Sequence, residues 1–249
     1  MFASSLFKGA ALSLAFAATQ AGKVAAQDTT KTSSFRSAWS AVTARSSATF
    51  SAIQSRPQGV LGDNIGLGYG VNGTYLLRLD NSGIWSIRAD VGVARYGNES
   101  HESPFSESVG GRVRVAVSTA NYVVPMSVGT QLALPRGVVR PYVNAGIGGI
   151  GFFTESSVSG ADQGEVIAAS TNQSSMTASW SVGGGANVPI TLGRIPVAFD
   201  AGVQYARGGN ARYLAPGSVA DLPGSQVSIT PLYSNTRLMV VHIGARIGR

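Results

Sequence analysis

Apolar and polar residues alternate with a period of two along most of the chain beyond residue 47. In Gly66–Leu79 the odd positions are mainly leucine, tyrosine and valine, whereas the even positions are mainly glycine or polar. The alternation recurs in Trp85–Ala94, Val139–Phe153, Ser175–Ile190, Val197–Tyr205 and Met239–Ile247. Strict alternation places one class of side chain on each face of a β-strand. Because no helical period competes, the pattern predicts an all-β protein.

Two all-β architectures fit this pattern, a soluble sandwich or barrel and a membrane barrel. The polar faces are mostly Gly, Ser, Thr and Asn, and only 12% of the residues are charged, about half the usual share. Most stretches also reach the roughly 9–11 residues of a tilted membrane strand. Aromatic residues near the strand ends predict an interfacial girdle of Tyr69, Trp85, Phe153, Phe199 and Tyr205. A transmembrane β-barrel is therefore favoured, with ordinary core positions as the alternative for these aromatics.

The connections between strands predict the strand number. Short connections alternate with long ones, as barrel topology requires: Asp80–Gly83, Leu134–Gly137 and Leu192–Pro196 are short, and Gly97–Gly111, Thr154–Ser174 and Gly208–Ser234 are long. The alternation holds if Arg112–Ala133 is one strand with a β-bulge near Asn121 and Tyr122, where its apolar phase switches. Ala48–Gln54 then supplies a first strand and Arg56–Ile65 the first outer loop. The prediction is an eight-stranded antiparallel up-and-down transmembrane β-barrel.

The N-terminal region predicts export. A short segment with one positive charge precedes the apolar run Gly9–Ala21, and small residues follow at Val24–Ala26, the layout of a cleaved signal peptide. The run is shorter than the roughly 20 residues of a membrane-spanning helix. We expect a signal peptide at 1–26, with cleavage after Ala21 as the second choice, a flexible lead-in at 27–47 and the barrel at 48–249.

The chain resembles the small outer-membrane β-barrel proteins of the OmpA/OmpX/OmpW-like superfamily. The resemblance rests on the signal, the eight alternating strands and the segment Pro141–Gly148, and it covers about Ala48 to Arg249. It implies a location in the cell outer membrane, contact with outer-membrane lipid, and insertion by the barrel-assembly machinery. The chain departs from the family pattern at Arg249, where members usually carry an aromatic residue.

Composition excludes several chemistries. The chain has no cysteine, so disulfides, thiolate metal sites and cysteine nucleophiles are absent. Its net charge of +7 comes from scattered arginines and lysines without a basic run, so we expect no nucleic-acid partner. His101 lies among Ser100, Ser103, Glu99, Glu102 and Glu107, which we interpret as a solvated loop rather than a catalytic or cation site. The glycines 183–185 indicate close packing within a strand. We therefore predict no catalytic residue, no metal and no cofactor.

The polar faces predict the barrel interior. The inward set comprises Arg88, Asp90, Tyr142, Asn144, Asp200, Gln204, His242 and Arg246, and Arg88 is expected to pair with Asp90 or Asp200. The glycines Gly66, Gly68 and Gly70 predict a shallow vestibule at the outer end. The first functional hypothesis is a monomeric structural or surface-interaction barrel with a filled, narrow lumen. The alternatives are a channel for small or apolar solutes and, less favoured, a lipid-modifying enzyme.

Overall fold

The computed structural model describes residues 45–104, 114–160, 166–192, 195–215, 218–222 and 226–248. The predicted signal peptide and most of the predicted lead-in, up to residue 44, lie outside these residues.

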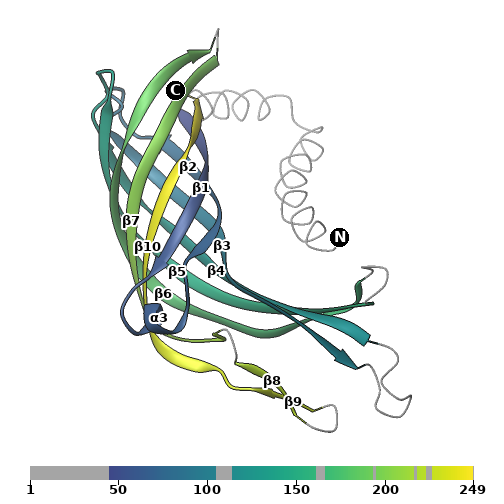
Figure 1. Cartoon of the computed structure of the whole chain (residues 1–249). Helices are drawn as coiled ribbons and strands as arrows, with labels where there is room; N and C mark the ends of the chain where they lie inside the picture. Colours follow the sequence, from purple (N-terminus) through teal and green to yellow (C-terminus); the bar gives the residue numbers. More distant parts are fainter. Residues whose placement is uncertain are drawn as a thin grey trace, which may run out of the picture.

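Eight long strands close into one antiparallel barrel (Figure 1). They are β1 (Ser46–Pro57), β2 (Gly68–Arg78), β3 (Trp85–Pro104), β4 (Arg114–Ala133), β5 (Arg140–Gly160), β6 (Val166–Leu192), β7 (Ile195–Tyr213) and β10 (Leu232–Gly248). Each strand pairs with its neighbour in the chain, and β1 pairs with β10 from Ser47–Gly248 to Pro57–Leu238 to close the barrel. The predicted eight-stranded up-and-down topology is confirmed, including its first strand.

The large apolar side chains of the barrel strands lie mainly on the outer surface of the wall. Phe50, Val143 and Ile147 are exposed by 73%, 61% and 74%, whereas their neighbours Thr49, Tyr142 and Asn144 are buried. A soluble barrel would place the large apolar side chains inside, because water faces its exterior. This inversion is stable only where hydrocarbon replaces water around the wall.

The two ends of the barrel differ. The turns β2–β3, β4–β5 and β6–β7 are short and share one end with Ser47 and Gly248, which pair there. At the opposite end, here called the loop end, strands continue well beyond the barrel (Figure 1). β6 alone has 27 residues.

The predicted long loops are largely strand, which corrects their assignment. β3 continues to Pro104, β5 and β6 pair through most of Thr154–Ser174, and the region Gly208–Ser234 holds the end of β7, the hairpin of β8 (Val219–Leu222) and β9 (Gln226–Ile229), and the start of β10. Beyond the lipid nothing enforces apolar alternation, yet backbone pairing between Ser-, Thr- and Gly-rich segments continues. The sequence pattern therefore marks only the part of each strand that faces lipid.

The first outer loop contains a short helix, α3 (Val60–Asn64), which the sequence did not predict. Gly59 precedes it at a positive φ of 60°, a conformation that costs glycine little. The helix is too short to display a helical period, but it buries Leu61 completely. Among the described residues no helix is long and apolar enough to cross a membrane.

The predicted β-bulge lies on the neighbouring strand. The pairing of β4 with β5 is continuous across Asn121 and Tyr122, so β4 contains no extra residue there. The register shifts instead between Arg95–Tyr122 and Gly97–Asn121, which leaves Tyr96 of β3 as the additional residue. The alternation indicated the level of the irregularity but not the strand, because a shift between two strands disturbs the phase relation of both.

Candidate functional site

The barrel interior is the candidate site, and two glycines make room for its largest polar side chains. A Cβ atom on Gly185 of β6 would lie 2.6 Å from the Tyr142 hydroxyl oxygen. A Cβ atom on Gly202 of β7 would lie 2.7 Å from Cε1 of His242. Because these two inward positions are glycine, both rings can lie across the lumen. Each glycine leaves the space that the large side chain on the neighbouring strand occupies.

Arg88 forms the centre of one half of this interior. Its Nε and Nη2 atoms donate hydrogen bonds of 2.7 and 2.8 Å to the two carboxylate oxygens of Asp90, and its Nη1 donates one of 2.8 Å to Gln131. The hydroxyl of Thr74 donates to Asp90 at 2.6 Å. The side chains of Arg88 and Asp90 are only 5% and 7% exposed, so this charge-assisted pair is buried in the barrel interior.

Tyr142 forms the centre of the other half. Its hydroxyl donates a hydrogen bond of 2.9 Å to Asp200 and lies 3.0 Å from Nε2 of His242. Nε2 of His242 is 3.7 Å from the second Asp200 oxygen. The guanidinium carbon of Arg88 lies 5.7 Å from the centre of the Tyr142 ring, within cation–π range. This contact joins the two halves across the lumen.

These residues form a continuous polar layer that links β2, β3, β4, β5, β7 and β10. We call it the polar layer; its members are Thr74, Arg88, Asp90, Gln131, Tyr142, Asp200 and His242. The structure thus pairs Arg88 with Asp90, one of the two expected carboxylates, while Asp200 binds Tyr142 and His242. Thr74 and Gln131 were not among the predicted site residues, although each lies in the inward phase of its strand.

The remaining predicted interior residues lie around this layer. Gln204 donates to Ser181 at 3.0 Å, and Arg246 donates to Ser47 at 2.9 Å. Asn144 is buried, and its Nδ2 atom has no hydrogen-bond partner among the described residues. The structure therefore turns all eight predicted residues inward, five of them into the polar layer.

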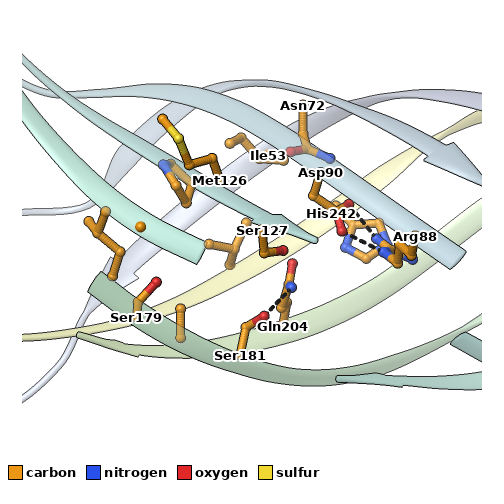
Figure 2. Close-up of a pocket in the computed structure, with 15 residues that line it drawn as sticks. Ile53, Asn72, Arg88, Asp90, Met126, Ser127, Ser179, Ser181, Gln204 and His242 are labelled. Atoms are coloured by element: carbon orange, nitrogen blue, oxygen red, sulfur yellow. Dashed lines mark hydrogen bonds and ion pairs between the residues drawn. The ribbon is translucent and has the colours of Figure 1, made fainter. Parts of the chain in front are cut away.

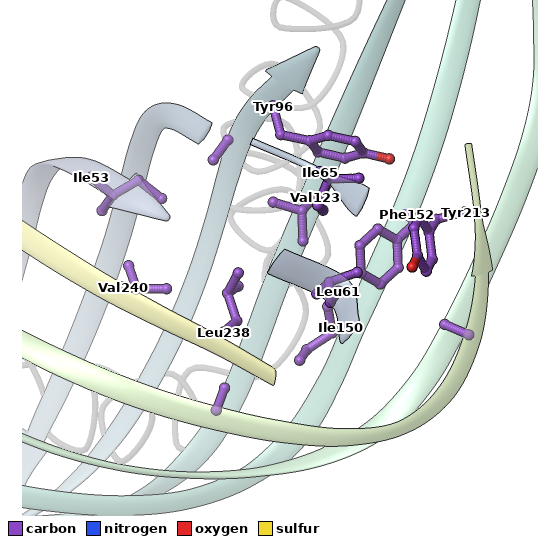
Figure 3. Packing of buried hydrophobic residues seen from close by; sticks show 13 residues of the cluster. Ile53, Leu61, Ile65, Tyr96, Val123, Ile150, Phe152, Tyr213, Leu238 and Val240 are labelled. Atoms are coloured by element: carbon purple, nitrogen blue, oxygen red, sulfur yellow. The ribbon is translucent and has the colours of Figure 1, made fainter. Parts of the chain in front are cut away.

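A second closure, the apolar plug, occupies the loop end (Figure 3). It consists of Leu61, Ile65, Tyr96, Val123, Ile150, Phe152, Tyr213 and Leu238, all buried. The Phe152 ring packs against Tyr213 at 5.5 Å and Tyr96 at 6.3 Å between ring centres.

Hydrogen bonds to the loops hold the apolar plug in place. The Tyr96 hydroxyl donates to the carbonyl of Leu214 at 3.0 Å, and Asn64 of α3 donates to the Tyr213 hydroxyl at 3.1 Å. The apolar plug occupies the place of the expected shallow vestibule, and of the three glycines that predicted it only Gly66 has open space beside it. A Cβ on Gly70 would overlap the Val93 carbonyl oxygen, and one on Gly68 would overlap the Ser55 hydroxyl.

A small cavity separates the two closures (Figure 2). Its volume is about 20 Å³, and its lining includes Arg88, Asp90 and His242 from the polar layer and Ile150 and Val240 from above. This is room for about one water molecule. Among the described residues, side chains therefore fill the interior around this small cavity.

The aromatic residues predicted for the girdle lie on the outer wall. Tyr69, Trp85 and Phe199 are 61%, 51% and 40% exposed. Phe153 and Tyr205 are half-buried, and Tyr205 packs edge-on against Trp180 at 6.0 Å. Tyr69 lies at the loop end and Trp85 at the turn end, so aromatic side chains flank the apolar band at both limits.

The candidate catalytic and cation residues of the outer loop fall largely outside the described part. The backbone of His101 belongs to β3 and pairs with Val117, but the side chains of 98–104 and all of 105–113 lie outside the description. Among the described residues no group of three or more His, Asp or Glu side chains is arranged to hold a metal ion.

A closed barrel with an apolar exterior is the architecture of integral outer-membrane β-barrels, and this chain has that architecture. No family model and no curated protein matches the sequence. Among solved structures, Neisserial surface protein A is similar at 15% identity and a TM-score of 0.42, covering 82% of this chain and 97% of that one.

Two further solved structures have similar sequence identities and TM-scores. The attachment invasion locus protein Ail of Yersinia pestis has 16% identity and a TM-score of 0.39, covering 81% of this chain and 96% of its own. The outer membrane protein AlkL has 16% identity and a TM-score of 0.37, covering 81% and 88%. Identities of this size concern the fold alone.

Proposed function

We propose that this protein is a structural, surface-interacting barrel of the cell outer membrane, with an interior closed by its own side chains. The observation that carries the proposal is the pair of stacked closures, the polar layer and the apolar plug, with a void of only about 20 Å³ between them. Eight strands leave a lumen just wide enough for side chains, and here the side chains fill it.

The loop end supplies the surface for interaction. β3 pairs with β4, and β5 with β6, well beyond the roughly 9–11 residues that cross the hydrocarbon. Backbone pairing continues to Pro104–Arg114 and to Ser159–Val166, so the outer connections are carried away from the membrane on hairpins. In this role we expect a monomer whose immediate partner is outer-membrane lipid, inserted by the barrel-assembly machinery.

An enzymatic role has weaker support from the interior. His242 has Asp200 and Tyr142 as its polar neighbours, and neither is a nucleophile of the serine or cysteine type. The group is also part of the polar layer and is buried in the barrel interior, out of reach of a lipid headgroup. The Tyr142–His242–Asp200 group therefore has a structural rather than a catalytic role in this proposal.

Planar-bilayer recording of the purified protein tests the closed interior. We expect no stable conductance steps from the wild type. The double variant Tyr142→Ala/Phe152→Ala removes one large side chain from each closure and serves as the control that an opened barrel is detectable. Stable steps from the wild type would refute the closed lumen and favour the channel for small solutes.

One feature of the wall favours an apolar-solute pathway as the second candidate. Pairing between β3 and β4 runs to Val91–Met126 and resumes at Ala94–Val123, so it is interrupted opposite Pro125, which has no N–H to donate. Pro125 and Met126 also line the cavity. Uptake of an apolar fluorescent dye into vesicles, compared between wild type and Pro125→Val, separates the candidates. Uptake that falls in Pro125→Val would favour the pathway.

Surface display is tested separately on intact cells. A short epitope inserted between Gly160 and Val166 should be labelled by antibody from outside, because the β5–β6 hairpin ends there. The same epitope inserted in the turn after Arg78 provides the control, since that turn lies at the opposite end. Labelling of the turn rather than the hairpin would reverse the proposed orientation.

A further inference from the structure

Four exposed arginines lie on the outer wall near the loop end, on neighbouring strands. Arg207 of β7 is directly opposite Arg237 of β10 in the strand register. Arg56 of β1 pairs with Met239 and is therefore a diagonal neighbour of Arg237. On the next strands Gln54 pairs with Tyr69, and Tyr69 pairs with Arg95. The four arginines form a belt across β7, β10, β1, β2 and β3, which we call the arginine belt.

Among the side chains that the structure describes, the arginine belt has no acidic partner. Like charges directly opposite on adjacent strands repel, so the Arg207–Arg237 pair destabilises the free barrel. Within the described part of the chain, neither guanidinium has a hydrogen-bond or ion-pair partner, and β1, β2 and β10 contain no acidic residue. Asp200, the acidic residue of β7, points inward to Tyr142. The nearby helix α3 carries Asp63, which makes no ion pair with these arginines.

The remaining two arginines are oriented by local contacts of Nε alone, which leave most of their donors available. Nε of Arg56 donates to Gln54 at 2.7 Å, and Gln54 donates to the Tyr69 hydroxyl at 3.0 Å. Nε of Arg95 lies 3.4 Å from the Gly97 carbonyl oxygen. Both terminal nitrogens of each side chain have no partner among the described residues, so each retains a fork of donors.

The arginine belt lies at the height of a lipid headgroup. Below Arg207 the outward positions of β7 are Tyr205, Val203, Ala201, Phe199 and Val197. From Val197 to Arg207 the strand rises about 33 Å, and a tilt of about 40° converts this to about 25 Å along the membrane normal. That distance equals the height of the apolar band of such barrels, about 25 Å. Trp180, which pairs with Arg207, and Tyr69, which pairs with Arg95, mark the same interface.

We propose that Arg56, Arg95, Arg207 and Arg237 bind the phosphate groups of phosphorylated lipid in the loop-side leaflet of the membrane. Guanidinium groups bind phosphate through two parallel hydrogen bonds, and phosphate supplies the negative charge that the arginine belt lacks. The lysines are Lys8, Lys23 and Lys31, so the barrel strands carry arginine and no lysine. The opposing arginines thus become favourable only when lipid is bound.

The test compares lipid binding and stability in one set of variants. The full barrel is placed in phosphatidylcholine nanodiscs with and without lipid A, and its melting temperature and retained lipid A are measured. For Arg207→Gln/Arg237→Gln we expect about tenfold weaker lipid A binding. In phosphatidylcholine alone, this variant should melt no lower than wild type, because a repulsion has been removed. Arg136→Gln, at the exposed turn end, is the matched control and should bind lipid A like wild type.

Each other outcome overturns the proposal. Unchanged lipid A binding in the double variant would show that the arginine belt is not the site, and an equal loss in Arg136→Gln would show attraction by net charge alone. Competition by inorganic phosphate as effective as lipid A would show a phosphate site without lipid recognition. A heat-shift gel verifies folding, and the single variant Arg237→Gln replaces the double one if that fails to fold.

Discussion

The two closures of the barrel both fill the lumen, but with different kinds of side chain. The polar layer fills its level with a bidentate Arg88–Asp90 pair and a Tyr142–Asp200–His242 group, all from strands. The apolar plug fills its level with Phe152, Tyr96 and Tyr213 and needs Leu61 from α3. Buried charges hold their geometry only while every partner is present, whereas apolar packing tolerates adjustment. We therefore expect the polar layer to respond steeply to single changes and the apolar plug more gradually.

The largest expected effect comes from removing one partner of the buried pair. Asp90→Ala leaves the Arg88 guanidinium with Gln131 but no carboxylate, and it also removes the acceptor of the Thr74 hydroxyl. Breaking a buried pair in this way costs about 3–5 kcal/mol. Urea unfolding in lipid vesicles measures the loss. The double variant Arg88→Met/Asp90→Ala is the control and should recover most of the stability, because no buried charge remains unpaired.

The apolar plug should lose less. Leu61→Ala creates a space beneath α3, which is fully buried at that residue, and the expected cost is about 2–4 kcal/mol. The damage should remain local, with faster amide exchange in α3 and at Tyr213 while the amides around Arg88 stay protected. Val60→Ala, at a neighbouring residue that is 59% exposed, should change stability by less than about 0.5 kcal/mol. Equal loss of protection at Arg88 would show that the two closures unfold as one unit.

A smaller change tests the connection between the halves of the polar layer. Tyr142→Phe keeps the ring that faces Arg88 but removes the hydroxyl shared by Asp200 and His242. The expected loss is about 1–2 kcal/mol, because one hydrogen bond to a buried carboxylate disappears. Combining it with Asp90→Ala gives a double-mutant cycle. Strict additivity of the two losses would show that the halves are independent despite their contact.

How far the sequence predicts the molecule depends on what the lipid enforces. Along the lipid-facing strands every second residue must be apolar, so the alternation predicts both the barrel and the inward orientation of residues such as Arg88, Tyr142 and His242. It also left Arg88 two candidate partners, Asp90 and Asp200. The choice depends on how the strands are staggered around the barrel, which brings Asp200 to Tyr142 instead.

The apolar plug could not be predicted in the same way. The alternation places Phe153 on the outer wall and Phe152 inward, but it does not predict that Phe152 packs against Tyr96 and Tyr213. Tyr96 is the additional residue of a β-bulge. Leu61 lies in a helix of five residues, which is too short to show a helical period of apolar residues. These positions depend on contacts between distant segments, such as Tyr96 with Leu214, rather than on a local pattern.

The smallest expected effect concerns a carboxylate outside both closures, which provides the solvent-exposed reference for the buried ones. Asp80 lies in the exposed β2–β3 turn, where hydrogen bonds from the Ser82 hydroxyl and the backbone amides of Trp85 and Ile84 lower its pKa from 3.8 to about 2. A lowered pKa means that the charged form stabilises the turn. This contribution is complete above pH 3.8 and is lost as the pH falls through about 2. Titration of the Asp80 carboxyl carbon by NMR measures the pKa directly, with Ser82→Ala expected to raise it toward the ordinary value. A wild-type value near 3.8 would show that the turn does not hold the carboxylate, and the exposed reference would then be an ordinary solvated acid.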